Sequence, residues 1–154
     1  GTVVGYVRTE SLLFGSVADE RAKVVCASGT KDAKTLQEIQ AEQKKVSDVK
    51  LLAALIYCEA GNQPYDGKVA VGAVVLNRME SRRFPNSLEG VIYQRGQFTP
   101  AMTGKLARVL RSGKIPSACY DAAEDAFEGQ DPVNGALFFN TRRGNFKLGD
   151  HYFS

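Results

Sequence analysis

Two apolar segments separated by a short polar break dominate the hydrophobic pattern of the chain. In Val49–Tyr57, apolar residues recur at spacings of three and four, and further apolar residues fill most of the remaining circumference. This pattern predicts a helix that is buried almost all round, with Ser47 as its N-cap and Gly61 and Pro64 as its stop. The second segment, Asp66–Arg82, predicts a helix with small residues near its start. Together the two segments predict a helical hairpin.

One acid, Glu59, lies in the last turn of the first predicted helix, at the bend of the hairpin. A carboxyl group at this position meets the negative end of the helix dipole and is partly desolvated, and both effects raise its pKa. A raised pKa suits a general acid. The alternative interpretation is a solvated acid at a helix end, since most carboxylates are exposed.

Weaker apolar stripes predict further helices on both sides of the hairpin. A polar linker helix is expected within Thr30–Val46, where the charges are expected to form a solvated face rather than a binding site. The other predicted helices are Asn86–Gln94, capped by Asn86 or Ser87, a basic helix in Gly104–Gly113, and Ala118–Glu128, capped by Ser117.

The pattern changes from a helical to a strand period in the last part of the chain. Ala136–Asn140, read ALFFN, and Phe146–Phe153, read FKLGDHYF, are separated by a polar turn. They predict a β-hairpin. The sequence therefore predicts a mainly α fold of the α+β class, with a small C-terminal β-hairpin.

Composition narrows the possible functions. The 154 residues, of which 44% are hydrophobic, suit one domain with a real core and a small appendage. The net charge of +3 is spread among many acids, which argues against a nucleic-acid partner but is compatible with an anionic wall polymer. No apolar run is long enough for membrane insertion, and no signal peptide is seen. Because the sequence begins with Gly1 rather than Met, we expect a trimmed or recombinant fragment.

Cysteine and histidine are scarce. Cys26, Cys58 and Cys119 show no C-x-x-C spacing, so neither a disulfide framework nor a metal site is expected, and no cofactor is predicted. Cys119 lies on an apolar stripe and is expected to be inert core. His151, the one histidine, could pair with Cys58 in a nucleophilic dyad. Cys58, however, sits inside an apolar helix, without the helix N-terminal position that lowers a thiol pKa.

The N-terminal segment has its own pattern. Gly1–Gly15, read GTVVGYVRTESLLFG, predicts a short strand entering a turn. The segment resembles the last strands of bacterial Src-homology-3-type wall-binding modules. We therefore expect a remnant of such a module and a linker in residues 1–29, a linker helix in residues 30–46, and the main domain in residues 47–154.

A series of blocks between Leu51 and Ser154 carries a second resemblance. In order they read I-Y-C-E-A, P-Y-x-G-K-V-A-V-G-A-V-V-L-N-R, F-P-N-S-L-E-G-V-I-Y-Q, Q-F, G-A-L-F-F-N and G-D-H-Y-F-S. Together they resemble the spore cortex-lytic or cell wall hydrolase family, whose fold is similar to that of lysozyme-like lytic transglycosylases. Many members read Glu-Ala-Arg-Gly-Glu where this chain reads Glu59-Ala60-Gly61-Asn62-Gln63.

The resemblance implies a lytic transglycosylase that cuts the bond between N-acetylmuramic acid and N-acetylglucosamine. Glu59 would act first as general acid and then as base, as the muramyl C6 hydroxyl attacks and a 1,6-anhydro sugar forms. A hydrolase with two carboxylates would need a second acid across the bond, and Asp66, Glu80 and Glu89 are poorly placed for that role. The substrate-binding residues we expect are Tyr57, Tyr93, Gln97, Phe98 and Asn140.

Several alternatives remain for individual residues and for the whole domain. Gln97 and Phe98 could instead form a turn whose ring plugs the core, and Asn77 could be a buried structural polar group. His151 could stabilise the hairpin rather than touch substrate. The domain as a whole could be a cysteine-type wall peptidase using Cys58 and His151, or a glycan-binding module without catalysis.

The same resemblance implies partners and a location. We expect peptidoglycan glycan strands as the partner, a monomer, and a secreted protein that acts on the cell wall or on the spore cortex or coat.

Overall fold

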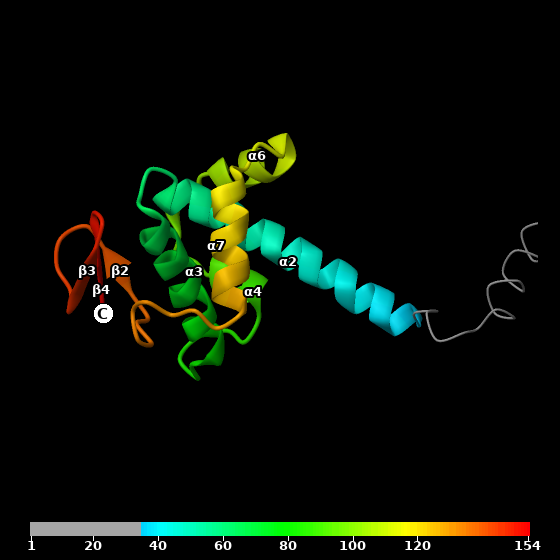
Figure 1. Cartoon of the computed structure of the whole chain (residues 1–154), viewed down its shortest axis with the longest axis horizontal. Helices are drawn as coiled ribbons and strands as arrows, with labels where there is room; N and C mark the ends of the chain where they lie inside the picture. Colours follow the sequence, from blue (N-terminus) through cyan, green and yellow to red (C-terminus); the bar gives the residue numbers. More distant parts are fainter. Residues whose placement is uncertain (1–34) are drawn as a thin grey trace, which may run out of the picture. The chain divides into compact units, whose positions relative to one another are not determined.

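The computed structural model describes residues 35–154 (Figure 1). The predictions for residues 1–29, including the wall-binding remnant and Cys26, lie outside the described residues. The elements are α2 Leu36–Ala60, α3 Tyr65–Glu80, α4 Leu88–Ile92, α5 Thr99–Met102, α6 Lys105–Ser112, α7 Ser117–Phe127, β2 Phe139–Asn140, β3 Phe146–Leu148 and β4 His151–Phe153.

Helix α2 is longer than the hydrophobic pattern predicts. It begins at Leu36, where the hydroxyl oxygen of Thr35 accepts a hydrogen bond from the Glu38 amide at 3.2 Å. The prediction that Ser47 caps a helix start is wrong, because its hydroxyl donates to the Lys44 carbonyl oxygen inside the helix. The residues before Ser47 are good helix formers, so no local signal stops the helix there. The division between a linker helix and a main domain stays a prediction.

The core forms around the two long helices, as the sequence predicts. The run from Leu51 to Ile56 on α2 is buried throughout and packs against α3, α4, α6 and α7. Helix α3 has a second buried face, where Ala70 and Val74 pack against Phe153 of the sheet. Helix α3 therefore lies between the other helices and the sheet, as Figure 1 shows.

A small residue allows the close approach of α3 and α7. A Cβ atom added at Gly72 would lie 3.0 Å from the Cβ of Ala126 and 3.2 Å from Cδ1 of Ile56. The small residues near the start of α3 are thus explained by close packing against α7 on one side and α2 on the other.

The C-terminal sheet has three antiparallel strands in the order β2-β4-β3. Phe139 pairs with Phe153, and Leu148 pairs with His151. The predicted second strand is broken in two, because Gly149 takes a φ of +57° and turns the chain between β3 and β4. The predicted fold class is confirmed, with a three-stranded sheet in place of a simple hairpin.

The helix boundaries confirm some capping predictions and correct others. The Ser87 hydroxyl accepts from the Gly90 amide at 3.1 Å and caps α4 as predicted. Ser117 is the first residue of α7 rather than its cap, since Pro116 precedes it at the cap position and no side chain caps this helix. Thr99–Met102, for which the hydrophobic pattern predicts no helix, forms the short helix α5.

A buried arginine attaches the chain before the sheet to α3. Arg78 is 4% exposed, and its Nε donates to the Leu137 carbonyl oxygen at 2.6 Å. Its guanidinium carbon lies 4.9, 5.1 and 5.2 Å from the ring centroids of Phe84, Phe98 and Phe138. Cation–π contacts of this kind are strongest where water is excluded.

Candidate active site

Glu59 lies at the bend of the helical hairpin, one residue before the end of α2. Its side chain is half-buried, and this burial raises the pKa of the carboxyl group, while the nearby positive charge of Lys105 lowers it in part. Within residues 35–154, no hydrogen bond or ion pair holds the carboxyl group. The predicted position at the helix end and the predicted direction of the pKa shift are therefore confirmed, and a raised pKa suits a general acid.

Helix α6 brings a positive charge to the end of α2. Lys105, the first residue of α6, has its Nζ 3.4 Å from the Cys58 carbonyl oxygen. No local sequence pattern points to Lys105, because Cys58 and Glu59 lie almost fifty residues earlier in the chain. Tyr57, two residues before Glu59, is 38% exposed and stands at the same helix end.

The turn of the sheet contacts the loop that follows Glu59. Gln63 lies in the loop between α2 and α3 and is 8% exposed. Its Nε2 donates to Oδ2 of Asp150 at 3.0 Å, and its Oε1 accepts from the Asp150 amide at 2.8 Å. No local sequence pattern predicts this pair either, because the two residues are 87 positions apart.

The structure distributes the predicted substrate-binding residues between surface and core. Tyr93 is 50% exposed at the end of α4, and Gln97 is partly exposed in the turn that follows. Phe98 is 1% exposed, with its ring centroid 6.3 Å from that of Phe139, so the alternative of a core plug describes its position. A ring buried in this way offers no surface on which a sugar could stack.

Asn140 organises a turn. Its Oδ1 accepts from the amides of Arg142 and Arg143 at 2.8 and 2.9 Å, and its Nδ2 donates to the Arg143 carbonyl oxygen at 2.9 Å. These bonds use the amide group internally. A contact of Asn140 with substrate stays a prediction.

Burial acts against a Cys58–His151 dyad. Burial raises the pKa of the partly buried Cys58 thiol, which disfavours the thiolate. Burial also lowers the pKa of His151, which disfavours its protonated form, although Asp150 opposes this effect. The His151 ring packs edge-on against Phe139 with centroids 5.1 Å apart. His151 is 7% exposed, and Cys119 is fully buried as predicted.

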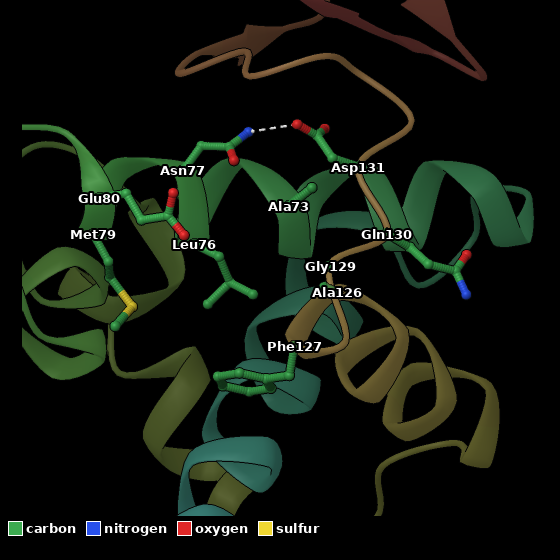
Figure 2. Close-up of a pocket in the computed structure, with 10 residues that line it drawn as sticks. All are labelled: Ala73, Leu76, Asn77, Met79, Glu80, Ala126, Phe127, Gly129, Gln130 and Asp131. Carbon is green, nitrogen blue, oxygen red and sulfur yellow. Dashed lines mark hydrogen bonds between the residues drawn. The ribbon is translucent and has the colours of Figure 1, made fainter.

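A cavity of about 410 Å³ lies elsewhere, between the second half of α3 and the end of α7 (Figure 2). It is lined by Ala73, Leu76, Asn77, Met79, Glu80, Ala126, Phe127, Gly129, Gln130 and Asp131. At a rise of about 1.5 Å per residue, the α3 residues that line it are about 12 to 22 Å along the helix from the bend at Glu59. Glu59 is therefore not part of this cavity.

The polar groups at the cavity wall are used to hold the chain. The Nδ2 of Asn77 donates to Oδ2 of Asp131 and to the Ala136 carbonyl oxygen, both at 3.2 Å. Asp131 also accepts from the amides of Val133 and Gly135. Figure 2 shows the Asn77 amide directed at the Asp131 carboxylate. The interpretation of Asn77 as a structural polar group is confirmed.

Residues 35–154 thus fall in the class of mainly helical domains with a small C-terminal sheet, and a half-buried acid lies at the end of a core helix. Residues 62–152 match the profile of the family described as Cell Wall Hydrolase, and the chain belongs to this family. The matched region begins three residues after Glu59.

Curated relatives agree with this family. The chain is 39% identical over 93 residues to the spore cortex-lytic enzyme of Bacillus subtilis. The aligned region covers 60% of this chain and 29% of the relative. It is 38% identical over 93 residues to the spore cortex-lytic enzyme of Halalkalibacterium halodurans. That aligned region covers 60% of this chain and 27% of the relative. The chain thus spans less than a third of the length of these relatives.

Solved structures share the fold. The catalytic domain of the germination-specific lytic transglycosylase SleB from Bacillus anthracis matches with a TM-score of 0.61 and 32% identity, over 69% of this chain and 92% of that chain. The catalytic domain of the Bacillus cereus SleB protein matches with the same TM-score and identity, over 88% of its length. Among the helices of residues 35–154, none has the length and apolar character needed to cross a membrane.

Proposed function

We propose that this domain is a peptidoglycan lytic transglycosylase in which Glu59 is the general acid and base. The observation that carries the proposal is the position of the half-buried Glu59 carboxyl at the hairpin bend, where burial also raises its pKa. The likeness to a germination-specific lytic transglycosylase supports the same activity. Peptidoglycan glycan strands are the proposed substrate. Action as a monomer, outside the cell and on the wall or spore cortex, belongs to the same proposal.

The chemistry requires one carboxyl group in two protonation states. The protonated Glu59 gives its proton to the leaving glycosidic oxygen as positive charge develops on the sugar ring. The resulting carboxylate then takes the proton of the muramyl C6 hydroxyl as that oxygen attacks the anomeric carbon, which closes a 1,6-anhydro ring and restores the acid. Lys105 favours the carboxylate, because its positive charge lowers the pKa of Glu59.

The neighbouring residues support binding of a sugar chain in different ways. Tyr57 and Tyr93 are exposed aromatic rings on which sugars could stack. Gln97 carries an amide that can bond hydroxyl groups, and Asn140 can offer the second hydrogen of its Nδ2 group, since the first is donated to the Arg143 carbonyl oxygen. The Phe98 ring lies inside the core, where it supports the surrounding chain by packing.

Digestion of purified vegetative peptidoglycan and of purified spore cortex, followed by mass spectrometry of the released muropeptides, tests the proposal. We expect products with 1,6-anhydro ends, and the preferred substrate identifies the wall type. Glu59→Gln should reduce the rate by about 10² to 10⁴. Reducing ends in place of anhydro ends would instead indicate hydrolysis.

The alternatives predict different results. A glycan-binding module would bind peptidoglycan and release nothing. A cysteine peptidase would lose its activity on alkylation of Cys58 with iodoacetamide and keep it in Glu59→Gln. Because burial raises the pKa of the Cys58 thiol, we expect slow alkylation and little loss of glycan cleavage.

A further inference from the structure

The loop that follows Glu59 is tied to the far end of the chain by a reciprocal pair of hydrogen bonds. The side-chain amide of Gln63 donates to the Asp150 carboxylate at 3.0 Å and accepts from the Asp150 backbone at 2.8 Å. Both groups of the amide are used, one as donor and one as acceptor. A carboxylate in place of Gln63 could not donate the first bond.

The contact is closely packed. Gly149 has a φ of +57°, and a Cβ atom added there would lie 2.4 Å from Gln63 Oε1 and 3.0 Å from Pro64 Cδ. The sheet turn therefore lies directly against the loop. The absence of a side chain at Gly149 allows both this approach and the left-handed backbone.

The loop is also held from within. The Gln63 amide N–H donates to the carbonyl oxygen of Ala60, the residue after Glu59, at 3.0 Å. The Gln63 carbonyl oxygen accepts from Nζ of Lys68 on α3 at 2.5 Å. Gln63 thus connects the last residue of α2, the first turns of α3 and the sheet turn.

We propose that Gln63 and Asp150 are positioning residues, whose paired hydrogen bonds fix the loop after α2 and so hold the Glu59 carboxyl in its half-buried orientation. This inference rests on the proposed function. The Gln63–Asp150 clamp contacts no substrate in this account. The clamp determines the position of the Glu59 carboxyl group. A shift of about 1 Å in a catalytic group can lower a rate by about 10²-fold.

A pair of substitutions that reverses the side-chain bond tests the clamp. In Gln63→Glu, two carboxylates face each other, and we expect the rate at saturating peptidoglycan to fall about 10- to 100-fold. Adding Asp150→Asn supplies a donor opposite the new acceptor and keeps the backbone bond. The double variant should therefore regain most of the rate. The single variant Asp150→Asn completes the double-mutant cycle.

Gln130→Glu is the matched control, because it makes the same change at an exposed position beside the distant cavity. It should leave the rate unchanged. Circular dichroism at the assay temperature must find each variant folded. If Gln63→Glu does not fold, Asp150→Ala removes the side-chain bond alone and is expected to lower the saturated rate several-fold, with little change in half-saturation.

The outcomes separate the two proposals. A folded Gln63→Glu with the wild-type rate overturns the clamp, and so does a double variant that stays as slow as the single one. An unchanged rate in folded Asp150→Ala has the same meaning. Glu59→Gln, assayed beside them, decides the proposed function independently, since full activity in that variant would refute the catalytic role of Glu59 whatever the clamp variants do.

Discussion

The Nζ atom of Lys105 lies 3.4 Å from the carbonyl oxygen of Cys58, the residue before Glu59. The lysine is thus placed at the end of α2 where helix carbonyl groups point outward and where the acid stands. Burial and this positive charge act on the Glu59 pKa in opposite directions, with burial the larger effect. The net effect is a raised pKa for Glu59.

Replacing Lys105 should therefore move the pH dependence of cleavage. Without the positive charge, the pKa of Glu59 rises further, and the alkaline limb of the rate profile shifts to higher pH. The initial rate across a pH series measures the shift in Lys105→Met. Arg111→Met, in the last turn of α6, removes the same charge at a distance and should leave the limb in place. A shift to lower pH in Lys105→Met would contradict the account.

Glu59→Gln should stabilise the domain at neutral pH. Because burial raises the folded-state pKa above that of the unfolded chain, the folded state binds the proton more tightly. The stability that Glu59 contributes is fully present below the unfolded pKa and is lost as the pH rises through the folded pKa. The glutamine side chain never ionises, so it avoids this loss.

Urea unfolding at neutral and acid pH measures the difference. The free energy of unfolding of Glu59→Gln should exceed that of the wild type at neutral pH, and the two should converge in acid. Glu80→Gln, at an exposed position of α3, is the control for removal of a carboxylate. A Glu59→Gln variant that is less stable than the wild type at neutral pH would mean that the carboxylate is held by a favourable contact.

Phe98 and Tyr93 should respond oppositely to substitution. Phe98→Ala removes a ring that is 1% exposed and should cost about 3–5 kcal/mol of stability, measured by thermal or urea unfolding. Its half-saturation on peptidoglycan, corrected for the folded fraction, should be unchanged. Tyr93→Ala, at a half-exposed position, should cost about 0.5 kcal/mol or less and weaken binding instead. Weaker binding in folded Phe98→Ala would restore that ring to the substrate-binding set.

Gly149→Ala should destabilise the domain by about 1–3 kcal/mol, from backbone strain and from the clash with the Gln63 side chain. Gly113→Ala separates the two causes, because Gly113 has a similar φ of +68° and an added Cβ there meets nothing within 4 Å. Unfolding of both variants should show the larger loss at Gly149. Equal losses would mean that the clamp relaxes without cost.

How much of the structure the sequence predicts depends on how far apart in the chain the interacting residues lie. The hairpin, its bend at Glu59 and the buried run of α2 come from periodicity and from stop signals within a few residues. The Ser47 cap was wrong, because a capping residue marks a helix start only where the preceding residues do not continue the helix.

The contacts around Glu59 depend on packing between distant segments. Lys105 and the Gln63–Asp150 pair reach the bend from α6 and from the sheet turn, and nothing in their local sequence patterns indicates the partner. The split of the last strand, in contrast, has a local signal, because Gly149-Asp150 is a two-residue pair typical of a tight hairpin turn.

The contacts of Arg78 have a consequence for how the sheet stays attached to α3. Its partners are three phenylalanine rings and the Leu137 carbonyl oxygen, and none of these groups gains or loses a proton in ordinary buffers. This fastening should therefore hold the start of the sheet independently of the Gln63–Asp150 clamp. Loss of the clamp would free the sheet turn, while the other end of the sheet stays anchored to α3.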